Sequence, residues 1–68
     1  MVTEHTRELY LQSQVGVFTC TFTTLSDGSI VYRGYANGVS MIDGVSIDED
    51  RFIQMWKHLL DKGYRVRR

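Results

Sequence analysis

The chain has 68 residues, a net charge of zero from eight basic and eight acidic side chains, and one cysteine. A chain this short allows one domain, residues 1–68, which buries only about 60% of its unfolded surface, and the lone cysteine excludes an internal disulfide. Zero net charge gives no global reason to expect a polyanionic partner, and without a long apolar run or a signal peptide we expect a cytoplasmic protein with no membrane span.

Several conformations are open for the beginning of the chain. Thr3 to Leu11 fits a short helix, whereas Leu9 to Ser13 fits a strand or an arm. A flexible arm is a further possibility for residues 1–8. The sequence alone does not decide among these alternatives.

A three-stranded meander is predicted next. Val15 to Thr24 alternates with period two and is rich in β-branched and aromatic residues, as strands are. Ile30 to Ala36 would return antiparallel to it. Asn37-Gly38 is a strong hairpin signal and leads into a third strand from Val39 to Ile42.

The first turn of this meander decides which side chains share a face. A two-residue loop at Asp27-Gly28 would place Phe22 opposite Arg33, among the core aromatics. A three-residue loop from Ser26 to Gly28 places Phe22 opposite Tyr32 instead. A register shift of one residue exchanges the two faces of a strand, and only the three-residue loop separates apolar from polar side chains. We therefore predict that loop.

The second turn orients the third strand. A two-residue Asn37-Gly38 loop pairs Gly34 with Met41, which puts Met41 and Val39 on the core side and Ile42 on the opposite side. The predicted core face consists of Phe18, Cys20, Phe22, Ile30, Tyr32, Val39 and Met41.

Residues 46 to 62 are predicted to form an amphipathic helix that covers this core face. Ser46 and Glu49 fit a capping box, although Asp48 as the N-cap would move the start by two residues. Gly63 supplies the left-handed residue that ends the helix in a Schellman-type closure. The apolar stripe consists of Phe52, Ile53, Met55, Trp56, Leu59 and Leu60.

The chain beyond the helix is basic. Tyr64 to Arg67 alternates and predicts a short edge strand, in which Val66 faces outward or toward the core depending on the register. Its positive charge either complements the helix dipole as a solvated tail or forms a docking patch for phosphate or an acidic protein surface.

No catalytic or ligand-binding pattern is recognised. Cys20 is expected on the core face, where a thiol is inert. The spacing of His5, Cys20 and His58 does not match that of paired metal ligands. We predict a protein that is not an enzyme, with no cofactor and no metal.

The face of the predicted sheet that points away from the helix is the candidate partner-binding surface. Arg33 is the one charged residue expected on this face. The face also contains Tyr35, and tyrosine and arginine are enriched at protein interfaces. An ordinary solvated face rich in threonine is the alternative. The predicted surface consists of Val17, Thr19, Thr21, Val31, Arg33, Tyr35 and Ile42, with Arg65, Arg67 and Arg68 from the C-terminal segment.

The junction between strand and helix carries a resemblance to a known family. Gly44 to Ile47, followed five residues later by Phe52, resembles the same junction in the positive-coactivator family of single-stranded DNA-binding proteins. The resemblance implies a curved four-stranded antiparallel sheet followed by one helix through which the family dimerises. Binding in that family depends on basic residues that line the sheet, whereas this chain offers only Arg33 and continues past the helix to Arg68.

The predicted fold is α+β: a small antiparallel meander of three to five strands, packed on one face by a single helix in the C-terminal half and followed by a short edge strand. The small core and the weakly charged second face favour a protein-binding module, of the kind that phages and mobile elements use as inhibitors or accessory proteins. Two alternatives stay open. One is single-stranded nucleic-acid binding through the sheet face and the basic C-terminus, and the other is a homodimeric structural protein.

Overall fold

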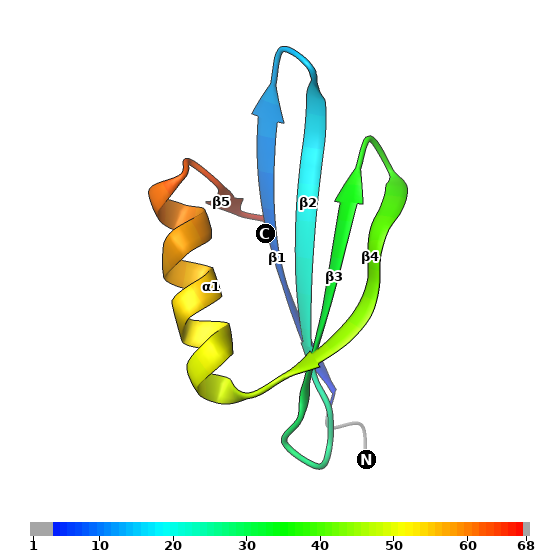
Figure 1. Ribbon diagram of the computed structural model, residues 1–68, viewed down its shortest axis with the longest axis vertical. Coiled ribbons are helices and arrows are strands. Elements are labelled where there is room, and N and C mark those ends of the chain that lie inside the picture. The colour runs from blue at the N-terminus through cyan, green and yellow to red at the C-terminus, as the bar shows by residue number, and fades with distance from the viewer. Residues whose placement is uncertain (1–3, 68) are drawn as a thin grey trace.

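The computed structural model describes residues 4–67, which form a five-stranded antiparallel sheet and one helix (Figure 1). The elements are β1 (His5–Ser13), β2 (Gly16–Thr24), β3 (Ile30–Ala36), β4 (Val39–Ile47), α1 (Glu49–Asp61) and β5 (Arg65–Val66). Their order across the sheet is β4-β3-β2-β1-β5. The first four strands are a meander, and the last strand returns to the outer edge of β1. The predicted α+β fold is confirmed.

The N-terminal segment is a strand. β1 pairs with β2 along its whole length, from His5 opposite Thr24 to Ser13 opposite Gly16. Leu9 in its centre is 0% exposed, and burial of a leucine side chain contributes about 1.5–3 kcal/mol. Tertiary burial therefore selects the strand over the short helix that the sequence also allowed. Residues 1–3 of the suggested arm lie outside the described residues.

The predicted register between β2 and β3 is confirmed. Phe22 lies opposite Tyr32, and the backbone N–H of Leu25 donates to the carbonyl of Ser29 at 2.8 Å to close a three-residue turn. Gly28 has a φ of 91°, a conformation that glycine adopts without steric cost.

The strand β4 differs from the prediction because two bulges interrupt its pairing with β3. Met41 is an inserted residue, so Gly34 pairs with Ile42 and not with Met41. Gly44 is the second insertion, and its φ of 85° is the left-handed conformation that glycine supplies in a bulge. The first bulge turns Ile42 to the side of the sheet that faces α1. The prediction that Ile42 belongs to the opposite face is therefore wrong.

The helix begins later than predicted. Asp48 is its N-cap, and the Asp48 carboxylate accepts a hydrogen bond from the backbone N–H of Arg51 at 2.7 Å. Ser46 lies within β4, opposite Val31, so the predicted capping box of Ser46 and Glu49 does not form. The ladder between β3 and β4 keeps Ser46 extended, and the alternative cap two residues later takes its place.

The end of the helix follows the prediction. Gly63 has a φ of 105°, and its N–H donates to the carbonyl of Leu60 at 3.1 Å. The N–H of Tyr64 donates to the carbonyl of Leu59 at 3.0 Å. These two bonds are those of a Schellman motif, and they redirect the chain from α1 into β5.

The core lies between α1 and strands β1 to β3. Phe22 stacks on Tyr32 with ring centroids 5.1 Å apart and meets the rings of Phe52 at 5.1 Å and Trp56 at 5.9 Å. The fully buried hydrophobic residues are Leu9, Cys20, Phe22 and Ile30. Three of them were predicted, and Leu9 was missed because the conformation of β1 was left open.

Part of the predicted core is exposed. Val39 and Met41 are 63% and 68% exposed, so both predictions are wrong. Ile53 and Leu60, expected in the apolar stripe of α1, are 41% and 42% exposed. The reason is coverage: α1 lies beside β1, and the turn between β3 and β4 projects away from it (Figure 1). A helix about 10 Å wide covers about two strands spaced 4.8 Å apart.

Candidate functional site

The side of the sheet that points away from α1, which we call the far face, has no covering element among residues 4–67. Its side chains on β2 and β3 alternate with the buried residues of those strands. The predicted residues that lie on it are Val17, Thr19, Thr21, Val31, Arg33 and Tyr35. Strand β1 adds Thr6, Glu8, Tyr10 and Gln12, which sequence reasoning missed because β1 was not assigned.

One row across the far face is aromatic and polar. Thr19 lies between Tyr10 on β1 and Tyr35 on β3. Arg65 lies opposite Tyr10 at one end of the row, and Ser40 lies opposite Tyr35 at the other. The row therefore joins two predicted site residues, Thr19 and Tyr35, to one predicted C-terminal residue, Arg65. Aromatic rings with one polar end are well suited to protein interfaces.

The neighbouring row, which we call the charged row, contains two bases and two acids. Its members in order across the sheet are Arg67, Glu8, Thr21, Arg33 and Asp43. The sequence predicted one charge on this face because β1 was unassigned and because the bulge at Met41 puts Asp43 where Ile42 was expected. The far face is therefore more charged than predicted, and its charges alternate in sign.

The two ends of the charged row differ in how their charges are held. Arg67 forms an ion pair with Glu8, and its guanidinium lies 4.7 Å from the centre of the Tyr10 ring. Arg33 lies opposite Asp43, but the two form no ion pair within residues 4–67. Arg67 is thus fixed in place and partly neutralised, while Arg33 is available. The remaining predicted residue, Arg68, lies outside the described residues.

A second uncovered surface lies on the side of the sheet that carries α1. Phe18, Ala36 and Val39 form a row across β2, β3 and β4 beyond the reach of the helix. Ile42 lies beside this row, and Met41, which is 68% exposed, is the inserted residue that precedes Ile42 in β4. We call these five residues the apolar patch. Sequence reasoning identified the apolar face but assumed that α1 would cover all of it.

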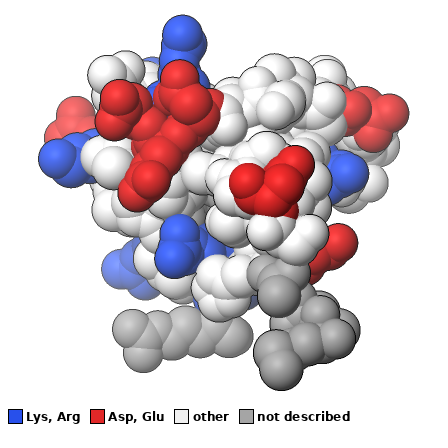
Figure 2. Space-filling view, turned by 90° about the horizontal axis from the view of Figure 1, so that it is seen from below, with Lys and Arg blue, Asp and Glu red and all other residues white. Residues whose placement is uncertain are grey.

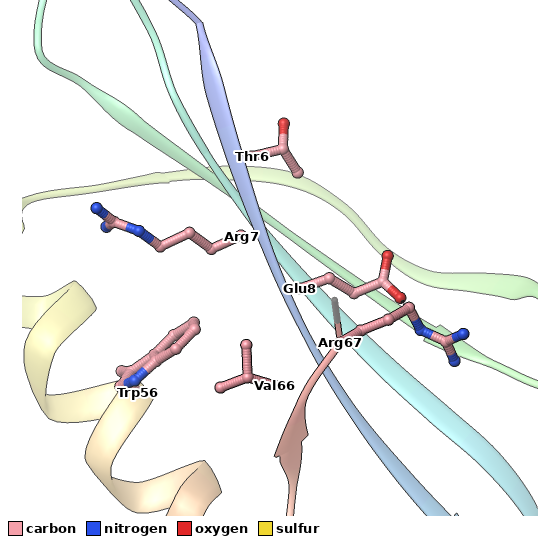
Figure 3. Close-up of a pocket in the computed structure, with 6 residues that line it drawn as sticks. All are labelled: Thr6, Arg7, Glu8, Trp56, Val66 and Arg67. Carbon is pink, nitrogen blue, oxygen red and sulfur yellow. Dashed lines mark ion pairs between the residues drawn. The ribbon is translucent and has the colours of Figure 1, made fainter.

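An open groove of about 520 Å³ lies between α1 and β1. It is lined by Thr6, Arg7, Glu8, Trp56, Val66 and Arg67. Figure 3 shows Arg7 and Trp56 on one side of β1, and Glu8 and Arg67 on the other. The polar groups diverge around the strand, so they do not converge on one bound molecule as the groups of a ligand pocket do.

The one thiol is held in the core. Cys20 is 5% exposed, and its Sγ lies 3.6 Å from the hydroxyl oxygen of Tyr32. Burial raises the pKa of the Cys20 thiol and also that of the Tyr32 hydroxyl. A thiol that stays protonated is a poor nucleophile. Residues 4–67 contain no cluster of three or more His, Cys, Asp or Glu side chains that could hold a metal ion.

The acidic side chains gather where α1 begins. Figure 2, which views the molecule from below, shows one group of acidic residues close together at the upper left and further acidic residues apart from it, at the centre and the right. Glu49 and Asp50 occupy the first turn, next to the N-cap Asp48. The positive end of the helix dipole favours carboxylates there. This acidic cluster is explained by helix stability.

No helix in the described part of the chain has the length and apolar character needed to cross a membrane. Comparisons with protein-family models, with curated proteins and with solved structures find no significant match for this chain.

Proposed function

We propose that this protein is a non-enzymatic protein-binding module that acts as an inhibitor or accessory factor by covering part of another protein. The observation that carries the proposal is the apolar patch, in which Val39 and Met41 are 63% and 68% exposed. Burying such a side chain contributes about 1.5–3 kcal/mol. The core of the described chain contains four buried residues. The free energy of burying Val39 and Met41 is not gained on folding, so it can be gained when a partner binds.

The bulges of β4 indicate how the partner docks. β4 is an edge strand, and an exposed regular edge would invite another strand to pair with it. The insertions at Met41 and Gly44 interrupt its ladder, which disfavours strand addition. The partner therefore contacts side chains. The row of Phe18, Ala36 and Val39 crosses three strands that are spaced about 4.8 Å apart, and this is close to the width of a helix, about 10 Å. The partner chemistry that fits is the apolar face of an amphipathic helix.

A cytoplasmic location is part of the proposal. The free thiol of Cys20 is compatible with a reducing compartment. The proposal assigns no catalytic role to the described residues. The Cys20 thiol is buried, and the polar side chains of the groove point to opposite sides of β1.

The test is a comparative capture from the organism that encodes the protein. Tagged wild type and the double variant Val39→Ser with Met41→Ser are used in parallel, and captured proteins are quantified by mass spectrometry. We expect a protein that wild type enriches and the double variant loses. Val15→Ser is the matched control, because Val15 is 78% exposed but lies outside the patch. Identical captured proteins for wild type and the double variant would contradict the proposal.

A direct measurement follows on the purified partner. We expect the double variant to bind at least tenfold more weakly by calorimetry, with an unchanged circular dichroism spectrum, while Val15→Ser binds as wild type does. Nucleic-acid binding is tested on a fluorescent single-stranded oligonucleotide at low salt, where phosphate contacts are strongest. Saturable binding there, lost on replacing Arg33 and Tyr35 with Ala, would replace the protein-binding proposal.

A further inference from the structure

The order of charges across the far face has a symmetry of its own. β2 is the middle strand of the five, and its contribution to the charged row, Thr21, is neutral. On the β1 side come Glu8 and then Arg67, and on the β3 side come Arg33 and then Asp43. At equal distances from the centre the two sides carry opposite charges.

We propose that the far face is a self-association surface, which pairs with the far face of a second copy across a two-fold axis roughly parallel to β2. Such an axis lies in the interface and exchanges left with right. It places each side of the charged row over the opposite side of the same row in the second copy. Arg33 then faces the partner's Glu8, and Asp43 faces the partner's Arg67. By symmetry each contact occurs twice.

The row of Arg65, Tyr10, Thr19, Tyr35 and Ser40, which we call the aromatic row, is also compatible with this two-fold axis. The axis passes over Thr19, which meets the same residue of the second copy, and Tyr35 faces the partner's Tyr10. At the ends of the row Arg65 faces the partner's Ser40. Aromatic pairs prefer offset or edge-to-face contacts, which two tyrosines on opposed sheets can make. The row contains no acid or base that would meet a like charge.

The other simple arrangement is excluded by charge. A two-fold axis perpendicular to the strands and centred on the charged row would place Arg33 over the partner's Arg33 and Asp43 over the partner's Asp43. Both contacts are repulsive in an interface from which water is excluded. The parallel axis is thus the arrangement that the charges support.

The far face is comparable in size to a small protein interface. Its four long strands, about 4.8 Å apart and seven to nine residues long, cover roughly 500 Å² in projection, and more once side-chain relief is counted. Stable interfaces bury about 800 Å² per partner. Two twisted sheets packed face to face align within about 30°, which an axis roughly parallel to β2 allows.

The side chains of the charged row already have conformations that suit this contact. The Glu8 carboxylate and the ring of Tyr10 already hold Arg67 in place, so little side-chain freedom is lost when it meets the partner's Asp43. Arg33 and Asp43 form no ion pair with each other within residues 4–67 and would find their counter-charges in the second copy.

Two single charge reversals test the arrangement when they are mixed. Glu8→Arg alone and Arg33→Glu alone each create two like-charge contacts in a homodimer, and we expect each to weaken dimerisation at least tenfold by analytical ultracentrifugation. A mixture of the two variants restores opposite charges at every contact. Because Glu8→Arg also removes the ion pair with Arg67 in its own chain, we expect the mixture to form a heterodimer that is tighter than either variant's homodimer, detected by native mass spectrometry.

Controls match the change in charge away from the far face. Arg51→Glu and Asp61→Arg lie on α1 and should dimerise as wild type does, and circular dichroism checks that every variant is folded. Wild type that stays monomeric at 100 μM in low salt overturns the proposal, as does a mixture of Glu8→Arg and Arg33→Glu that forms no heterodimer. The proposal is independent of the apolar patch, so Met41→Ser should leave dimerisation unchanged even if it abolishes partner binding.

Discussion

Phe22 is the side chain on which the core depends most. It is 1% exposed and contacts the rings of Tyr32, Phe52 and Trp56. We expect Phe22→Ala to lower the free energy of unfolding by about 3–5 kcal/mol, a large part of the 5–15 kcal/mol typical of small domains. Urea denaturation followed by circular dichroism measures it. Val15→Ala, at an exposed position, should change stability by less than about 0.5 kcal/mol. Equal effects of the two would show that Phe22 is not central.

The buried Cys20 and the partly buried Tyr32 make stability depend on alkaline pH. Burial raises both pKa values above their ordinary values of 9.0 and 10.0, so the folded state keeps protons that the unfolded state loses. A raised pKa contributes stability that is fully present below the ordinary value and declines as pH rises above it. We expect the urea midpoint to fall between pH 8 and pH 10.5, and to fall less in Tyr32→Phe. An equally steep decline in that variant would assign the effect to other groups.

At the scale of elements, the start of α1 decides between Ser46 and Asp48, which the sequence left as alternative N-caps. The Asp48 carboxylate accepts from the N–H of Arg51 at 2.7 Å, whereas Ser46 belongs to β4. Asp48→Ala should cost about 1 kcal/mol of stability, the usual value for a lost N-cap. Ser46→Ala should cost less than about 0.5 kcal/mol. Thermal denaturation of both variants compares them, and a larger loss for Ser46→Ala would place the cap at the earlier residue.

The elements also show which parts of the fold could be predicted from the sequence. The turn at Gly28 and the helix end at Gly63 were predicted because each needs a left-handed residue and glycine is there. The bulges of β4 could not be predicted, because residues 39–47 alternate equally well in more than one register. The exchange of Ile42 for Asp43 on the far face follows from one inserted residue. That exchange puts Asp43 opposite Arg33, so the β2 and β3 residues of the far face could be predicted from the sequence but its full set of charges could not.

At the scale of the whole molecule, the sequence did not predict how much of the apolar sheet face α1 covers. α1 has 13 residues and is about 20 Å long at 1.5 Å per residue, whereas the molecule extends over 40 Å. β4 continues to Ile47 before the helix begins, so α1 starts at the end of the sheet opposite the turn between β3 and β4 (Figure 1). One short helix cannot reach Val39. An apolar face in the sequence therefore predicts where a core can form but not how much of it one helix covers.

The proposed pairing of the far faces predicts that the stability of the whole molecule depends on its concentration. When a dimer unfolds to two chains, a tenfold rise in protein concentration stabilises it by about 1.4 kcal/mol of dimer. For chains of this size that corresponds to a rise of about 3–6 °C in the unfolding temperature. We expect calorimetry at 10 and 100 μM to show this rise for wild type. Arg33→Glu should show a smaller rise, because its weaker dimer leaves more chains to unfold as monomers. A wild-type unfolding temperature independent of concentration would mean that the far face, with its alternating charges, stays in solvent.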